Sequence, residues 1–171
     1  MAGQAVGADR DDLVLRVGLL SLAMALGYAL LCTFILAFGA ALIARGFTDD
    51  VEVIETAIRL LYVAAAFQLG DACNIIARGV LRGTGDVRYA AVVSVTASWL
   101  ALPPLTWLLG HHYGLGAIGG WYGICAEIAV ASCFLWWRLW GKGWQAAAAK
   151  SREDLRREEE KREAAELAQA A

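Results

Sequence analysis

Four long apolar segments constrain what this chain can fold into. Residues 13–44 form the first of them, and this run exceeds the roughly 20 apolar residues that a helix needs to cross the hydrocarbon core of a bilayer. Three further apolar segments cover about 52–79, 89–110 and 117–140. Apolar residues make up 59% of the 171 residues, which is typical of a membrane protein and exceeds what a soluble core requires. We therefore predict an all-α membrane protein with four transmembrane helices.

Charged residues lie mainly at the ends of the chain and in the loops, which divides it into three parts. These are an N-terminal segment (1–12), the four-helix membrane part (13–140) and a charged tail (141–171). Lys and Arg collect on one predicted side of the membrane, and this excess marks the cytoplasmic side. We therefore expect a multi-pass protein of the inner (cell) membrane with both termini in the cytoplasm. No patch typical of nucleic-acid binding is predicted.

The second apolar segment contains a carboxylate, Asp71, among apolar residues. A charge near the bilayer centre costs roughly 2.5 kcal/mol or more, so Asp71 is a candidate functional residue that needs a partner, water or an ion. Gln68 before it, and Asn74 and Arg78 after it, continue at spacings of three or four and share its helix face, which predicts a supporting polar face from Gln68 and Asn74. Glu127, near the middle of the fourth segment, is a second candidate, and we leave open whether it titrates or is a structural carboxyl.

The turn after the second segment reads RGTGDVR, residues 82–88. Gly83 and Gly85 permit backbone conformations closed to other residues, and we expect Arg82 to remain charged in water. No GK[ST] follows the glycines and no strand precedes them, so a phosphate-binding loop is not predicted. In the preceding loop, Thr48 with Asp49 or Asp50 is expected to cap the second helix.

The third and fourth segments carry helix-breaking and close-packing signals. Pro103 and Pro104 predict a kink, with neighbouring helices or hydroxyls such as that of Thr106 satisfying the freed carbonyls. The glycines that follow predict a smooth face for close helix packing; they are Gly116, Gly119, Gly120 and Gly123. His111 and His112 are adjacent and do not define a metal site, and we expect neither metal nor cofactor.

The end of the fourth segment and the tail complete the organisation. FLWWRLWGKGW, residues 134–144, is expected to form an aromatic belt at the membrane interface. The tail is rich in helix-forming residues without an apolar seam, which predicts a solvated helix. The four cysteines lack paired CxxC spacing and are interpreted as small buried hydrophobes.

Several of these segments, in this order, resemble the multidrug and toxic compound extrusion (MATE) family, in particular its sodium-driven bacterial branch. The similar stretches are GQAVGA, FTDDVEV, FQLGDACNIIARGVLRGTGD, Trp99 with Pro104, and GLGAIGGWYG. The resemblance covers about residues 3–140. It implies the last four helices of a twelve-helix transporter, so the chain is expected to be a fragment that starts just before the ninth helix.

The resemblance also implies roles for particular residues. Asp71 matches the acidic residue of the tenth helix that takes part in cation binding, whereas Phe67 replaces a Tyr of some members and Asn74 replaces a frequent Gln. The partner acid would lie on the missing seventh helix. Glu127 stands where Gly is common, so no family role passes to it.

The function implied by the resemblance is that of an antiporter and not of an enzyme. It would export small cationic or amphipathic compounds in exchange for Na⁺ or H⁺, together with the missing N-terminal helices and within the lipid bilayer. We expect the chain alone to be an incomplete unit. The alternative is a small four-helix membrane protein that acts in interaction or assembly without transport.

Overall fold

Every regular element among the described residues is a helix. The structure, a computed structural model, describes residues 2–170, and the side chains of all of these except 164 and 167–170. Its elements in chain order are α1 (Ala2–Gly7), α2 (Asp11–Arg45), α3 (Val51–Gly83), α4 (Val87–Leu100), α5 (Leu102–Trp107), the short π-helix η1 (Leu108–His112), α6 (Gly116–Trp140) and α7 (Gln145–Ala170).

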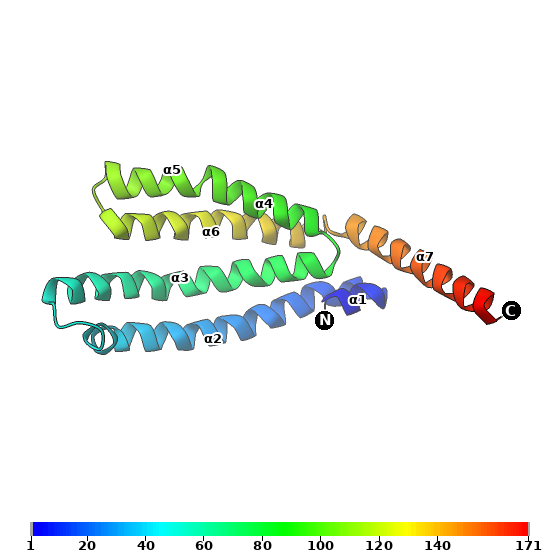
Figure 1. The fold of residues 1–171 in the computed structure, drawn as a ribbon, viewed down its shortest axis with the longest axis horizontal. Coiled ribbons are helices and arrows are strands. Elements are labelled where there is room, and N and C mark those ends of the chain that lie inside the picture. Colours follow the sequence, from blue (N-terminus) through cyan, green and yellow to red (C-terminus); the bar gives the residue numbers. More distant parts are fainter. Residues whose placement is uncertain (1, 171) are drawn as a thin grey trace.

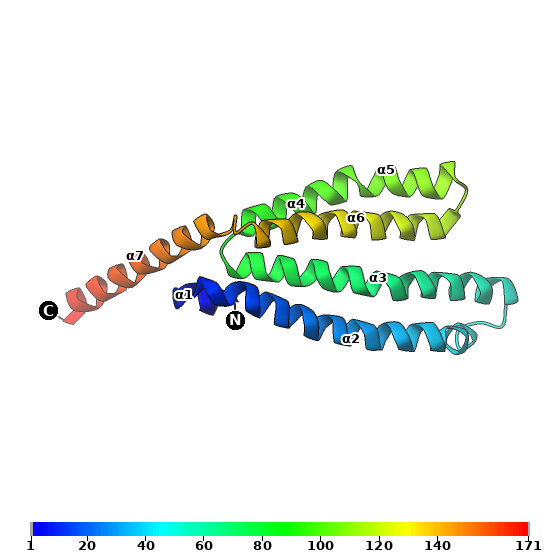
Figure 2. The ribbon, with the colours of Figure 1, turned by 180° about the vertical axis from the view of Figure 1, so that it is seen from behind.

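The predicted spans are confirmed as helices. Within residues 2–170, four helical stretches are long and apolar enough to cross a membrane: α2, α3, α6, and the run from Val87 to His112 that combines α4, α5 and η1. α2 packs against α3, α3 packs against α6, and α6 packs against α4, α5 and η1. Figures 1 and 2 show these elements lengthwise, with α7 extending beyond the end where α1 lies.

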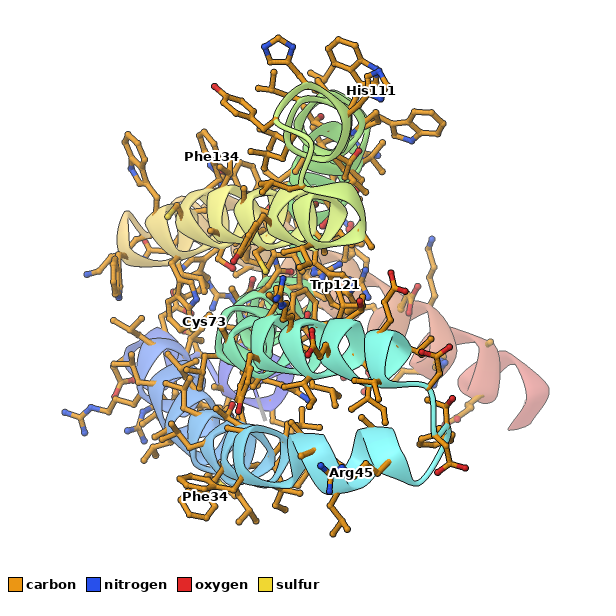
Figure 3. All side chains as sticks on the ribbon, turned by 90° about the vertical axis from the view of Figure 1, so that its left-hand side faces the viewer. Phe34, Arg45, Cys73, His111, Trp121 and Phe134 are labelled. Carbon is orange, nitrogen blue, oxygen red and sulfur yellow. The ribbon has the colours of Figure 1, made fainter. Side chains whose placement is uncertain are left out.

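Viewed from one end, the helices form a row and not a closed bundle (Figure 3). Because each span in a row has an open side, many large apolar side chains are exposed. Met24 and Phe38 on α2 and Trp99 on α4 are each more than three-quarters exposed. In a membrane protein, such surfaces are covered by lipid or by further helices.

Asp50 starts α3 by capping it. Its Oδ1 accepts hydrogen bonds from the backbone N–H of Glu52 at 3.0 Å and of Val53 at 3.4 Å, and the Thr48 hydroxyl accepts from the N–H of Asp50 at 3.2 Å. These contacts satisfy orphan donors of the first helical turn. The prediction of a cap at this loop is confirmed.

The two prolines interrupt the third span. α4 ends at Leu100 and α5 begins at Leu102, with Pro103 in the first turn of α5, where a missing N–H costs little. The Thr106 hydroxyl donates to the carbonyls of Leu102 at 2.8 Å and Pro103 at 3.0 Å. The prolines deprive the carbonyls of residues 99 and 100 of donors, and Thr106 bonds neither of them. The prediction that the Thr106 hydroxyl satisfies the freed carbonyls is therefore wrong.

Two of the four glycines predicted to form a packing face do so. A Cβ on Gly119 would lie 2.5 Å from the carbonyl of Leu109, and one on Gly123 would lie 2.8 Å from the Thr106 side chain. Their bare backbone lets α6 approach α5 and η1 closely. Gly116 and Gly120 have open space, so the prediction is wrong for them; Gly116 has a φ of +56° at the start of α6.

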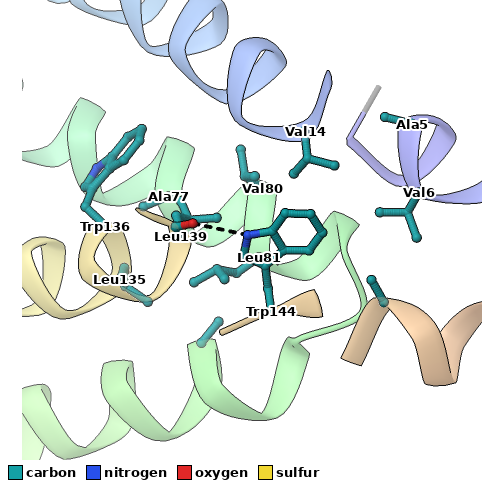
Figure 4. Close-up of a cluster of buried hydrophobic side chains, with 12 residues drawn as sticks. Ala5, Val6, Val14, Ala77, Val80, Leu81, Leu135, Trp136, Leu139 and Trp144 are labelled. Carbon is teal, nitrogen blue, oxygen red and sulfur yellow. Dashed lines mark hydrogen bonds between the residues drawn. The ribbon is translucent and has the colours of Figure 1, made fainter. Parts of the chain in front are cut away.

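The apolar core lies at the end of the row that holds α1 and the base of α7 (Figure 4). Val14 of α2, Leu81 of α3 and Leu135 of α6 are fully buried there. Trp144 is also buried, and its indole N–H donates to the Leu139 carbonyl at 3.2 Å. Ala148 of α7 is buried beside it. The base of the tail is therefore packed and not free, which corrects the prediction of a wholly solvated helix.

Two further predictions about side chains are correct only in part. Trp137 and Trp140 are exposed as a belt requires, whereas Trp136 is buried and its indole N–H donates to the Cys73 carbonyl at 3.1 Å. The cysteines are free, but Cys133 is exposed and the other three are half-buried. Neither His111 nor His112 belongs to a cluster of potential metal ligands among the described residues.

Candidate cation site on the second span

Asp71 lies in the interior of α3 and is half-buried. Gln68, one turn earlier on α3, is also half-buried, and Asn74, one turn later, is 2% exposed. The shared helix face predicted from their spacing therefore points partly into the protein. Among the described residues, the Asp71 carboxylate takes part in no hydrogen bond and no ion pair. The carboxylate thus remains available to a ligand or to a further protein segment.

Asn74 joins this face to α6. Its Nδ2 donates to the Ile128 carbonyl at 3.4 Å, while its Oδ1 is buried without a hydrogen-bond partner in the described part of the chain. Buried polar atoms normally find partners, so an unpartnered amide oxygen one turn along the helix from a carboxylate requires an explanation. Carboxylate and amide oxygens are the ligand types that hard cations prefer.

A groove between α3 and α6 lies beside this face. It has a volume of about 400 Å³ and an apolar lining that includes Phe67, Gly70 and Ile128. Phe67 packs edge-on against Trp121, with ring centroids 5.7 Å apart. Asp71 itself does not line the groove, although its neighbour Gly70 does. The structure therefore places the carboxylate next to an apolar groove and not inside it.

Glu127 occupies a separate position between α6 and α4. It is 9% exposed, and its Oε1 accepts a hydrogen bond from the Ser98 hydroxyl at 3.3 Å. No hydrogen bond among the described residues joins it to Asp71. The two acidic candidates therefore belong to different helix pairs.

The residues predicted to shape the turn after α3 have different roles from one another. Arg82 is exposed, as expected. Gly85 has a φ of +87°, which favours glycine, but Gly83 is the last residue of α3 and does not use the conformational freedom that glycine permits. A Cβ on Gly83 would lie 3.1 Å from that of Ala2, so its role is the close approach of α1. Pro104 is exposed in α5.

An ion pair that the sequence did not reveal fixes the same turn. Asp86 precedes α4, where an acidic residue usually caps the helix, yet its side chain makes no capping bond. Its Oδ2 instead accepts from Arg138 Nε at 2.9 Å, and the Asp86 side chain is 8% exposed. The Arg138 guanidinium also lies 4.7 Å from the centroid of the Tyr89 ring. Opposite charges 52 residues apart are not a local signal, which is why the sequence did not indicate this pair.

Comparison with known proteins places the chain in a family. The family model described as MatE matches residues 1–108. This chain belongs to the MatE family. The match includes Asp71, Gln68, Asn74 and Pro104, whereas Glu127 lies outside it. The predicted family is thus confirmed, and its sodium-driven branch stays a prediction.

Curated relatives carry the description "probable multidrug resistance protein NorM". The protein from Bacillus cereus is 35% identical over 137 residues, which cover 80% of this chain and 30% of the relative. Those from Rhodopseudomonas palustris and Bacillus subtilis are 31% and 30% identical over 141 and 139 residues, with similar coverage. The chain spans about 30% of the length of the curated relatives it matches.

Proposed function

We propose that this chain forms part of a MatE-type secondary antiporter that exports small cationic or amphipathic compounds in exchange for Na⁺ or H⁺. Asp71 is its cation-coupling residue, and Gln68 and Asn74 support it. The observation that carries the proposal is a half-buried carboxylate that has no partner among the described residues and lies inside an apolar helix of a MatE family chain. The multidrug resistance description of the relatives favours drug-like compounds as the exported class.

The chemistry of coupling follows from the cost of a bare charge. An ionised carboxylate within the membrane is unfavourable, so Asp71 binds a cation or a proton when it is out of contact with water. The loaded and unloaded forms therefore favour different conformations, and this difference couples export of the compound to movement of the cation down its gradient. The Oδ1 of Asn74, which has no hydrogen-bond partner in the described part of the chain, supplies a second oxygen one turn away on the same helix.

The proposal includes a membrane orientation. Both termini and the turn at 82–88 lie in the cytoplasm, and the loop at 46–50 lies outside. Cysteines introduced singly into these two loops, in a cysteine-free background, report this with a membrane-impermeant thiol reagent in intact cells. Labelling at 48 without labelling at the exposed position 82 is expected. The reverse pattern would contradict the orientation.

The first test is cation binding by the chain itself. Reconstituted in lipid vesicles, the chain is expected to bind radiolabelled Na⁺ or to release protons on Na⁺ addition, and Asp71→Asn is expected to abolish this. Asp49→Asn is the matched control, because Asp49 is an exposed loop residue outside the α3 cap. Equal binding by Asp71→Asn and the unchanged chain would refute the role of Asp71.

The second test is transport. The chain spans about 30% of its relatives, so the test uses the Bacillus cereus NorM protein with residues 3–140 of this chain in place of the corresponding segment. We call this hybrid the exchange protein. The exchange protein is expected to expel ethidium under a Na⁺ or H⁺ gradient, and its Asp71→Asn form is not. The chain alone is expected to be inactive. Gradient-driven efflux that persists in the Asp71→Asn form would overturn the proposal.

An interaction or assembly protein without transport is the other candidate, and α7 is the feature that favours it. Beyond its packed base, the described side chains of this helix are mostly exposed, and many are charged. An exchange protein that is well expressed and inserted, yet inactive, would support this candidate.

A further inference from the structure

Two cavities lie one after the other along α4, and neither belongs to the site at Asp71. The first is a polar cavity of about 360 Å³ between the start of α4 and the base of α7. The second is an apolar groove of about 330 Å³ between α4 and α6. We propose that together they bind one anionic phospholipid, with its phosphate in the polar cavity and an acyl chain in the apolar groove. Such binding requires neither cation coupling at Asp71 nor transport.

The helical period of α4 brings the two cavities into line. Arg88 lines the polar cavity. Three residues line the groove at intervals of four, namely Val92, Thr96 and Leu100. Residues four apart on a helix are neighbours, so Arg88 stands one turn before Val92, where the groove begins. A molecule with a charged head and an apolar tail can therefore contact both cavities at once.

The polar cavity carries more free positive than negative charge. Arg88 and Lys150 line it, are both exposed, and form no ion pair among the described residues. Asp86 also lines it, but its carboxylate is paired with Arg138 at 2.9 Å. The remaining acid of the lining is Asp154. Basic side chains in a cavity at the edge of the membrane attract the phosphate of an anionic lipid.

The groove has the polarity and the depth of one bilayer leaflet. Its lining is almost wholly apolar, and it includes the exposed Phe134, which lies on the side of α6 away from α3 (Figure 3). From Val92 to Leu100 the groove runs about 12 Å along α4, compared with roughly 15 Å for half of the hydrocarbon core. Trp137 on α6 is exposed just beyond Phe134 and marks the membrane interface at this end. The headgroup of a lipid in the groove therefore lies at the level of the polar cavity.

Hydrogen bonds between α4 and α6 hold the walls of the groove in place. Near the polar cavity, the Tyr89 hydroxyl donates to the Phe134 carbonyl at 3.2 Å. Towards the other end, the Ser98 hydroxyl donates to Glu127 Oε1 at 3.3 Å. Because both walls are fixed without a ligand, an acyl chain can enter with little ordering of the protein, which favours binding.

Native mass spectrometry of the full chain in a mild detergent tests the position of the phosphate. Phosphatidylglycerol is expected to bind more tightly than phosphatidylcholine, whose headgroup has no net charge. Arg88→Gln is expected to weaken phosphatidylglycerol binding about fivefold. Asp154→Asn removes the free acid of the cavity and is expected to strengthen it. The matched control is Arg16→Gln, which removes an exposed cation from α2 at the same end of the row and should leave binding unchanged.

A bulky substitution tests the position of the acyl chain. Thr96→Trp fills the groove and is expected to weaken phosphatidylglycerol binding at least as much as Arg88→Gln. Val95→Trp is the matched control, because Val95 is an exposed neighbour that does not line the groove. It is expected to leave binding unchanged.

Four results would overturn the proposal. They are equal affinity for the two phospholipids, unchanged binding by Arg88→Gln, equal effects of Thr96→Trp and Val95→Trp, and displacement of phosphatidylglycerol by inorganic phosphate as effectively as by the phospholipid itself. The last would mean that the groove adds nothing to binding. If Thr96→Trp loses helical content by circular dichroism, the opposite effects expected of Arg88→Gln and Asp154→Asn decide.

Discussion

Breaking the Asp86–Arg138 pair is expected to destabilise the end of the helix row where the termini lie. In Arg138→Met, Asp86 would remain 8% exposed with its charge uncompensated. Removing one partner of a buried ion pair costs roughly 3–5 kcal/mol, and Arg138 is one-third exposed, so we expect about 3 kcal/mol. The loss of its stacking on Tyr89 acts in the same direction.

The double variant separates the energy of the ion pair from the separate contributions of the two side chains. Asp86→Asn alone is expected to cost about 2 kcal/mol, because a charged hydrogen bond becomes a neutral one. Asp86→Asn/Arg138→Met has no orphaned charge, so its cost should fall below the sum of the single costs by about 1–3 kcal/mol. The free energy of unfolding is measured by circular dichroism in detergent micelles titrated with denaturant.

The control is Arg88→Met, which removes an exposed charge from the start of α4 and is expected to change stability by less than about 0.5 kcal/mol. Two results would refute the reasoning. One is a cost below about 1 kcal/mol for Arg138→Met, and the other is strict additivity of the two single variants. Either would mean that the pair is screened by water and contributes as a surface ion pair does.

Two further substitutions test close packing and the docked tail. Gly119→Ala places a Cβ within 2.5 Å of the η1 backbone and is expected to cost about 2 kcal/mol or more in the same unfolding assay. Gly120→Ala is the control, because its Cβ meets open space and should leave stability unchanged. Equal effects of the two substitutions would contradict the geometry. Arg152→Ala removes a 2.9 Å ion pair with Asp11 and is expected to cost about 1 kcal/mol or less, but to speed proteolysis of the tail. The exposed Arg156→Ala is its control, and a tail cleaved equally fast in both variants would argue against docking.

The spans could be predicted from the sequence because a bilayer leaves few alternatives. A run of about 30 apolar residues has to satisfy its own backbone, and a helix does so. Two local features could also be predicted, because each acts on its neighbours in the chain. Asp50 caps α3 from one residue before it, and the Pro103–Pro104 pair breaks the third span. Asp71 could be identified as a candidate because a charge in such a run is rare, although its coupling role stays a prediction.

The contacts that fix the termini could not be predicted, because they depend on which helices are neighbours. Trp136 and Trp137 are adjacent in sequence, yet one is buried and the other is exposed. An aromatic cluster next to basic residues is typical of an interface belt, and composition does not show which face meets protein. The contact of Arg152 with Asp11 spans 141 residues and likewise has no local signature.

The row arrangement has a consequence for biosynthesis. Neighbours in the row are mostly neighbours in the chain, so α2 with α3, and α4 and α5 with α6, can each pair soon after they leave the ribosome. The contact between α3 and α6 is different, because it can form only after α6 has been synthesised. The Trp136 indole reaches the Cys73 carbonyl across 63 residues, and this bond forms only after both hairpins are inserted. The two hairpins are therefore joined through α3 and α6 only after α6 has been synthesised, and the contact between α7 and α1 forms later still.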